Sequence, residues 1–152
     1  MVQTTVEGRQ QLLDALAEAT EAIGVALASL SAAYEQLDEH YAGELEEGLF
    51  RPVQLAYGRA RRTHAEFAGR HGLTSCNFEP PSAGLPSTGA KGFIGNAVVA
   101  VGRADTTLAD LQDSLLPVEV GDEQVRASLA ELRELVGGLA ERARELVRTI
   151  GR

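Results

Sequence analysis

The chain has 152 residues, the usual size of one domain, and 44% of them are hydrophobic, so a packed core is possible. A net charge of −8 excludes the overall positive charge that attracts nucleic acid or an anionic membrane surface, so we expect neither as a partner. Only 5% of residues are aromatic and none is Trp, which favours helix packing over a β-sandwich. The single cysteine, Cys76, excludes an internal disulfide and a cysteine-rich zinc site.

The N-terminal segment carries a series of residues at intervals of three and four from Leu13 to Tyr41, all of them apolar or aromatic except Thr20. This spacing places one apolar stripe along a helix. Thr4 and Glu7 have the spacing of a capping box, so we predict a first helix over about 4–47.

The same spacing resumes at Phe50 and continues to His71, and Pro52 suits the first turn of a helix. It predicts a second helix over about 51–71. The next segment, 72–92, is rich in Gly, Pro and Ser and has no helical period. We predict a loop there, and its length is uncommon inside a compact helical domain.

Two further segments with helical spacing follow the loop, and they predict helices over about 93–116 and 123–150. Pro117 ends the first of these helices, because proline lacks the N–H that a helix interior needs. Asp122 has the short acceptor side chain that caps the start of the second.

Together these segments predict a single domain over 1–152, an all-α antiparallel four-helix bundle with coiled-coil-like heptad seams. The long loop joins its two helical hairpins. Because the first helix is much longer than the second, part of its apolar seam has no partner along the hairpin. We expect that part to pack in a homo-oligomer, a dimer or larger, since apolar seams rarely stay exposed. The alternative is that the first helix breaks and folds back; three glycines could bend or split it, namely Gly24, Gly43 and Gly48.

Charge is divided between the first two helices. Residues 1–48 carry many acids and one base, Arg9, whereas residues 49–71 carry arginines and one acid, Glu66. Attraction between the two helices would fix their orientation. The alternative is an exposed arginine patch that binds an anion or a partner protein. The candidates for that patch are Arg59, Arg61 and Arg62.

A histidine on the apolar stripe of the second helix is the best candidate for chemistry. If the first hairpin turns near Leu49, His64 lies opposite Tyr34, and Asp105 of the third helix reaches the same level. With Tyr57, these residues would form one buried polar cluster. A His beside a carboxylate can exchange a proton or bind a ligand or metal. The alternative is a satisfied polar layer that fixes the register of the helices.

Metal chemistry of the di-iron type needs Glu-x-x-His motifs on facing helices. This chain contains no such motif, so its resemblance to ferritin-like proteins is limited to the architecture. We therefore predict no metal and no cofactor.

Residues 34–38 read Tyr-Glu-Gln-Leu-Asp. This Tyr-x-x-x-Asp pattern resembles the export signal of type VII secretion substrates, which are also antiparallel helical hairpins. The Trp-x-Gly turn usual in that family is absent here. The resemblance implies a helical substrate of a specialised secretion system.

No catalytic constellation is recognisable, so the sequence favours a protein that is not an enzyme. We interpret the chain as a non-enzymatic interaction or scaffold module that self-associates and binds a protein partner. The alternatives are a small-ligand or metal-binding helical bundle and a type VII-like secretion substrate. The single cysteine suits a reducing cytosol, so we predict a cytoplasmic location, and the N-terminal residues lack the basic and apolar regions of a classical signal peptide.

Overall fold

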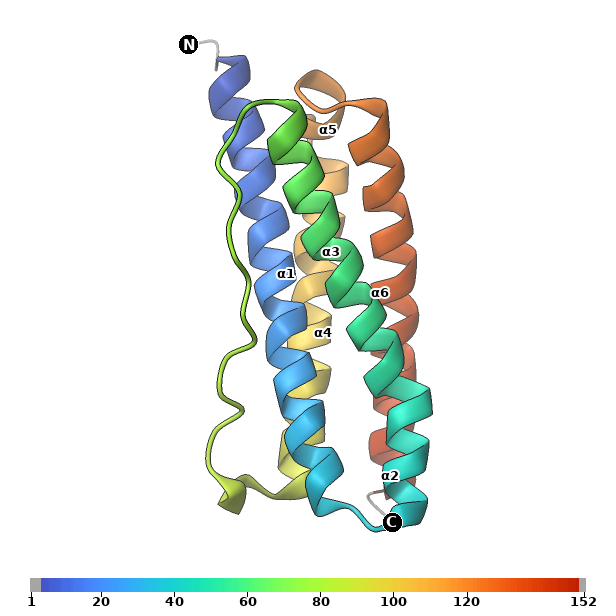
Figure 1. Ribbon diagram of the computed structural model, residues 1–152. Coiled ribbons are helices and arrows are strands. Elements are labelled where there is room, and N and C mark those ends of the chain that lie inside the picture. Colours follow the sequence, from blue (N-terminus) through green and yellow to red (C-terminus); the bar gives the residue numbers. More distant parts are fainter. Residues whose placement is uncertain (1–3, 151–152) are drawn as a thin grey trace.

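The computed structural model describes residues 4–150, and within that range it is entirely helical apart from connecting segments, with no strand. The all-α prediction is confirmed. Four long helices run side by side along one axis (Figure 1). They are α1 (Thr5–Gln36), α3 (Arg51–Arg70), α4 (Gly89–Asp113) and α6 (Glu123–Ile150). The short elements are α2 (Glu39–Leu45), the π-helical turn η1 (Glu46–Phe50), the 3₁₀ turn η2 (Pro86–Thr88) and α5 (Leu116–Glu119).

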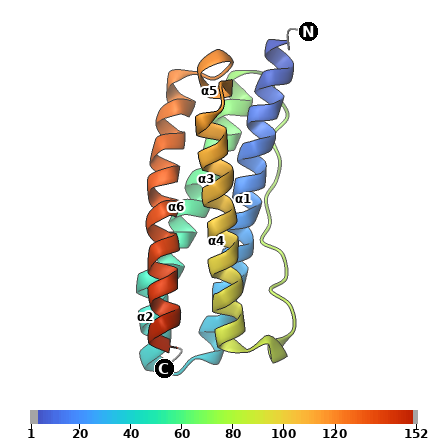
Figure 2. The ribbon, with the colours of Figure 1, turned by 180° about the vertical axis from the view of Figure 1, so that it is seen from behind.

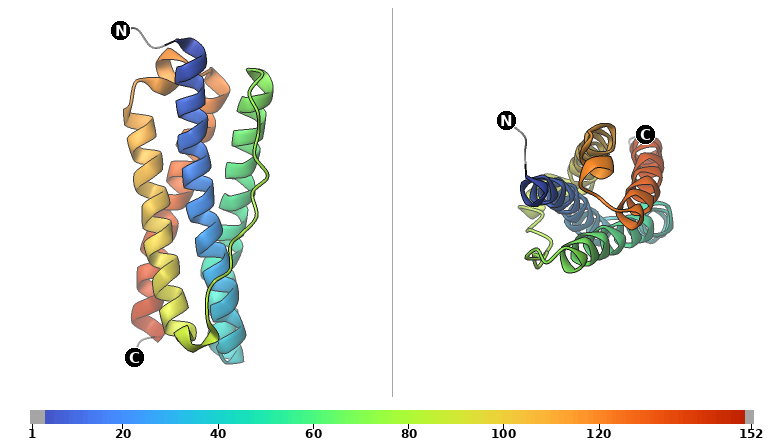
Figure 3. Two further views of the ribbon diagram at one scale, coloured as in Figure 1. Left: turned by 90° about the vertical axis from the view of Figure 1, so that its left-hand side faces the viewer. Right: turned by 90° about the horizontal axis from the view of Figure 1, so that it is seen from above.

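Seen from above, the long helices occupy four corners in the order α1, α4, α6 and α3 (Figure 3). Helices α1 and α6 run in one direction and α3 and α4 in the other, so neighbours are antiparallel (Figures 1 and 2). Packing is most extensive between α1 and α4 and least extensive between α3 and α6. Because α3 and α4 are parallel and lie at opposite corners, the connection between them runs back along the whole molecule.

Helix α1 begins where the sequence predicts and ends earlier. The capping box is formed, since Oγ1 of Thr4 accepts the N–H of Glu7 at 3.1 Å and a Glu7 carboxylate oxygen accepts the N–H of Thr4 at 3.4 Å. Leu37 is extended, and the Asp38 carboxylate accepts the N–H of Tyr41 at 3.0 Å to start a new helix. The predicted helix over 4–47 is therefore wrong, because the chain reverses at residues 37–38.

The second arm of the hairpin is correspondingly longer than predicted, since α2, η1 and α3 form one continuous helical rod (Figure 1). In η1 the N–H of Arg51 donates to the carbonyl of Glu46, five residues earlier. This wide turn shifts the phase of the rod, so that Leu45, Leu49 and Val53 are all buried. The two arms have matched lengths, and no half of α1 is left without a partner.

The last two long helices follow the sequence more closely. Helix α4 begins at Gly89, before the predicted residue 93, and a short helical link, α5, carries Pro117. Helix α6 begins as predicted, and the Asp122 carboxylate caps it by accepting the N–H of Val125 at 2.7 Å.

The core lies along the common axis and receives side chains from all four long helices. Most of the apolar positions with helical spacing are buried, whereas Tyr34 and Leu115, at helix ends, are exposed. The buried positions include Leu13, Leu16, Ile23 and Leu30 in α1, Val53, Ala60 and Phe67 in α3, Ile94, Ala97, Val101, Ala104, Leu108 and Leu111 in α4, and Val125, Leu129, Leu132, Val136, Leu139 and Ala143 in α6.

Helix α1 has the length and apolar character of a membrane-spanning segment. Its most apolar window has a mean hydropathy of 1.3, and 50% of that window is buried inside the protein. Core helices pass the same test, so this property alone does not distinguish a core helix from a membrane span.

Candidate functional site

The connection from α3 to η2 lies over the groove between α1 and α3 (Figures 1 and 3). We call residues 72–85 the strap. Near its end, Nε2 of Gln36 donates to the carbonyl of Pro86 at 3.0 Å. Three apolar side chains, five residues apart, are partly buried against the core: Leu73, Phe78 and Ala83. The predicted loop is therefore a packed cover for this groove.

His64 lies beneath the strap and is only 1% exposed. Its ring meets the Phe78 ring edge to face, with 5.0 Å between centroids. Its Nδ1 is buried without a hydrogen-bond partner. Burial lowers the pKa of His64, and the negative charge of Asp14 offsets only part of that effect. His64 is therefore a neutral packing residue at pH 7.

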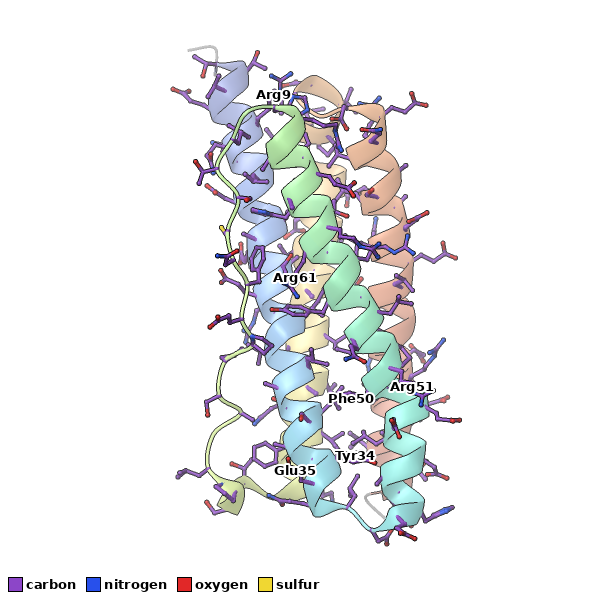
Figure 4. All side chains as sticks on the ribbon, in the orientation of Figure 1. Arg9, Tyr34, Glu35, Phe50, Arg51 and Arg61 are labelled. Atoms are coloured by element: carbon purple, nitrogen blue, oxygen red, sulfur yellow. The ribbon has the colours of Figure 1, made fainter. Side chains whose placement is uncertain are left out.

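The structure does not bring the four predicted cluster residues together. Tyr34 is 41% exposed at the end of α1, where it lines a small cavity with Phe50 (Figure 4). Asp105 is half-buried on α4 and faces α6, since its Oδ1 lies 3.8 Å from where a Cβ at Gly137 would be. The prediction failed because it placed the turn near Leu49 and set α3 beside α4.

Among the four predicted cluster residues, Tyr57 lines a cavity large enough to hold a small organic molecule. We call this space, of about 370 Å³ between the strap, α1 and α3, the strap cavity. Its lining residues are Glu21, Gly24 and Val25 of α1, Tyr57 of α3, and Asn77, Phe78, Glu79 and Pro81 of the strap. Tyr57 is 6% exposed. Burial raises the pKa of its hydroxyl, Arg61 lowers that pKa and Glu79 raises it further.

The three candidate arginines do not form one patch. Arg59 makes an ion pair with Glu131 of α6, and its Nε is buried without a partner. Arg61 lies over the ring of Tyr57, with its guanidinium carbon 5.4 Å from the ring centroid, and Figure 4 shows it beside the α1–α3 groove. Arg62 is exposed. Within residues 4–150, no ion pair joins α1 to α3, so the predicted charge pairing between these helices is not formed.

A groove with a volume of about 590 Å³ lies between α3 and α6, and we call it the open groove. Its lining residues are Pro52, Leu55 and Arg59 of α3 and Glu131, Glu134, Leu135, Gly138, Leu139 and Arg142 of α6. Leu55 is 52% exposed there. Sequence reasoning missed this surface, although Leu55 and Leu135 are leucines outside the buried stripes and could have signalled it.

One polar cluster fastens the end of α3 to the start of α6. The Asp122 carboxylate accepts hydrogen bonds from Nε and Nη2 of Arg70, at 2.8 and 3.0 Å, and lies 2.8 Å from Nε2 of His71. Burial alone would raise the pKa of Asp122, but these hydrogen bonds and that from the Val125 N–H hold it well below its usual range. We call Asp122, Arg70 and His71 the Asp122 cluster, and its role is to join two helices.

Three further sequence features concern a metal site, the Tyr34–Asp38 motif and Cys76. Among residues 4–150, no group of three or more His, Cys, Asp or Glu side chains lies close enough to hold a metal ion. The Tyr34–Asp38 motif spans the last turn of α1 and the hairpin turn, where the Asp38 carboxylate caps α2. Cys76 is exposed in the strap.

No protein-family model, no curated protein and no solved structure matches this chain.

Proposed function

We propose that this protein is a non-enzymatic helical scaffold module that self-associates through the open groove. The observation that carries the proposal is the exposure of Leu55, 52%, over a hollow lined by further leucines between α3 and α6. Apolar grooves edged by charged residues are the usual docking sites for helices of another chain.

We also propose that the long helices constitute a four-helix bundle with heptad-like seams. Two observations support this: buried residues recur at intervals of three and four in each long helix, and each helix is antiparallel to both of its neighbours. A bundle of this kind presents rigid helical surfaces, which suits a scaffold.

A second copy of the chain is the partner that the open groove fits best. Its edges carry two bases, Arg59 and Arg142, and two acids, Glu131 and Glu134, so the groove is locally neutral in a chain of net charge −8. In a two-fold dimer, each base can meet an acid of the other copy. Arg59 already pairs with Glu131, whereas Arg142 and Glu134 make no ion pair within residues 4–150. Those two are free to pair between copies.

The sequence predicted assembly through an unpaired part of the first helix, whereas the dimer proposed here forms through the open groove. The unpaired half of a long first helix does not exist, because α1 ends at Gln36. The open groove supplies the exposed apolar surface instead. A cytoplasmic location and a further protein partner are part of the proposal only as predictions from the sequence.

Light scattering coupled to size exclusion, across a concentration series, tests the dimer. We expect the wild type to reach the dimer mass and Leu55→Glu to remain monomeric, because a buried carboxylate would oppose association. Val99→Glu is the matched control, since Val99 is 61% exposed on α4, away from the groove. A monomeric wild type at all concentrations, or equal dissociation of the control, would refute the proposal.

A charge exchange tests the orientation of the two copies. Arg142→Glu should weaken the dimer by bringing like charges together, and adding Glu134→Arg should restore it. The readout is the dissociation constant from sedimentation, with helical circular dichroism to confirm folding. Equal weakening by the single and the double variant would exclude the pairing of Arg142 with Glu134.

A further inference from the structure

We propose that the strap cavity binds an organic cation with an aromatic or apolar body. The cavity brings together two carboxylates, Glu21 and Glu79, and two aromatic rings, Tyr57 and Phe78. Carboxylates attract a positive charge, and the faces of aromatic rings bind cations while their surfaces bury apolar carbon.

The two carboxylates reach the cavity from different elements. Glu21 is on α1 and Glu79 is on the strap, and neither makes an ion pair within residues 4–150. Two carboxylates without an ion-pair partner at one cavity favour a positively charged occupant, although the guanidinium of Arg61 lies near the Tyr57 ring.

The interior of the cavity is shaped by a glycine and an unpartnered hydroxyl. A Cβ at Gly24 would lie 3.2 Å from Cε1 and 3.6 Å from the hydroxyl oxygen of Tyr57, so a side chain there would crowd the ring. Tyr57 is 6% exposed as a whole residue, it lines the cavity, and its hydroxyl makes no hydrogen bond to any residue in 4–150. The hydroxyl is therefore available to accept a hydrogen bond from a ligand N–H donor in the cavity.

The strap side of the cavity is stiff, which suits a preformed site. Pro81 lines it and follows Pro80, and proline fixes the backbone φ angle. Phe78 is anchored against the ring of His64. The strap is therefore ordered before a ligand binds, so that binding loses little conformational entropy there, which favours ligand affinity.

A substitution at Arg61 tests the proposal through the direction in which the affinity for a cation changes. Its guanidinium lies 5.4 Å from the Tyr57 ring centroid and would repel a cation held at that ring. Arg61→Gln should therefore strengthen binding of a cation by about two- to threefold. Weaker binding of the cation by Arg61→Gln would overturn the proposal, because it would mean that the arginine attracts the ligand.

The primary experiment uses 2-phenylethylamine as the probe, with the neutral 2-phenylethanol as its comparison, titrated into ¹⁵N-labelled full-length protein. We expect the amine to shift the amide signals of Gly24 and Asn77 and to bind about tenfold more tightly than the alcohol. No binding of the amine, equal affinities, or shifts confined to other regions would overturn the proposal.

Paired variants isolate the role of the two carboxylates. Glu21→Gln with Glu79→Gln should weaken amine binding about tenfold. The control is Glu18→Gln with Glu35→Gln, which removes the same charge from exposed positions of α1 outside the cavity. If both double variants weakened amine binding equally, the amine would be attracted to the overall acidic surface, and the proposal of a specific site in the strap cavity would be overturned. Because the open groove lies between α3 and α6, these outcomes are independent of the dimer test.

Discussion

Helix α3 borders two grooves that differ in how they are closed. The groove toward α1 is covered by the strap, whose Phe78 packs on His64. The groove toward α6 has no cover and leaves Leu55 half exposed. The difference follows from topology: α3 and α4 are parallel at opposite corners, so their connection must run the length of the molecule and covers the groove along which it runs (Figure 3). The path of this one connection therefore explains why the groove between α1 and α3 is a covered cavity and the groove between α3 and α6 is an open surface.

The two grooves also differ in the kind of contact that holds them. The covered groove is held by buried apolar and aromatic contacts. The contact between α3 and α6 includes, besides core side chains, the ion pair of Arg59 with Glu131 at the open groove and the Asp122 cluster at the end of α3. Apolar contacts respond little to salt and pH, whereas these polar contacts respond to both.

The largest effect is expected from removing the anchor of the covered groove. Phe78→Ala deletes a partly buried ring over His64, and we expect it to lower the free energy of unfolding by about 2–3 kcal/mol, measured by urea denaturation. Leu85→Ala, at a 72% exposed position, is the control and should change stability by less than about 0.5 kcal/mol. Equal effects of the two changes would show that the strap is not a packed cover.

The next largest effect is expected where the Asp122 cluster joins the end of α3 to the start of α6. Asp122→Ala removes the cap of α6 and the hydrogen bonds from Arg70 and His71, and it should lower the free energy of unfolding by about 2 kcal/mol at pH 7. Asp113→Ala, at an exposed carboxylate near Arg133, is the control and should have a much smaller effect.

The stability difference between wild type and Asp122→Ala is expected to become smaller as the pH falls. The folded pKa of Asp122 is lowered, so its contribution is complete above the usual aspartate pKa, about 3.9, and is lost as the pH falls below it. The stability difference between wild type and Asp122→Ala should therefore shrink between pH 5 and pH 2. A constant difference over that range would contradict the charged cluster.

Much of the fold follows from local signals that the sequence displays directly. Asp122 lies just before a segment with helical spacing, and α6 begins there. Thr4 and Glu7 form the expected capping box. Caps of this kind act within one turn, so they can be predicted without knowing the rest of the structure.

The position of the first turn could not be read from the same signals. Apolar spacing continues through Tyr34, Leu37 and Tyr41 although the chain reverses between them. No Gly or Pro marks the turn, and the informative residue is Asp38, a cap in the middle of an otherwise regular pattern. The predicted site depended on this turn, so an error in its position also misplaced Tyr34 relative to His64.

The strap and the open groove were unpredictable for a different reason. The strap has no periodic pattern, and the packing of Phe78 on His64 depends on which corner each helix occupies. That arrangement arises from long-range packing, to which local sequence signals give no direct access.

A smaller effect is expected from the unpaired nitrogen in the covered groove. His64→Leu keeps an apolar side chain beneath Phe78 and removes a buried Nδ1 without a partner, so it should stabilise the protein by about 1 kcal/mol at neutral pH. Urea denaturation measures this change, and clear destabilisation would mean that the imidazole makes a contact that leucine cannot replace.

The same variant should change the response to acid. The folded pKa of His64 is lowered, so the unfolded chain binds the proton more readily and wild-type stability falls as the pH drops below about 6.5. His64→Leu should weaken this loss between pH 7.5 and 5.5. His40→Gln is the control, because His40 is exposed, and it should retain the wild-type pH dependence. An unchanged acid response of His64→Leu would contradict the burial of a neutral imidazole.

The smallest effect is expected from the ion pair across the open groove. Arg59 and Glu131 have side chains that are 38% and 59% exposed, so solvent screens their attraction, and Glu131→Gln should lower the free energy of unfolding by only about 0.5 kcal/mol. The loss should vanish in 1 M salt, where the Debye length is about 3 Å. Glu141→Gln, which breaks an exposed pair with Arg144 inside α6, should cost no more. If Glu131→Gln instead matched Phe78→Ala, polar bridging would hold the open groove as firmly as burial holds the covered one.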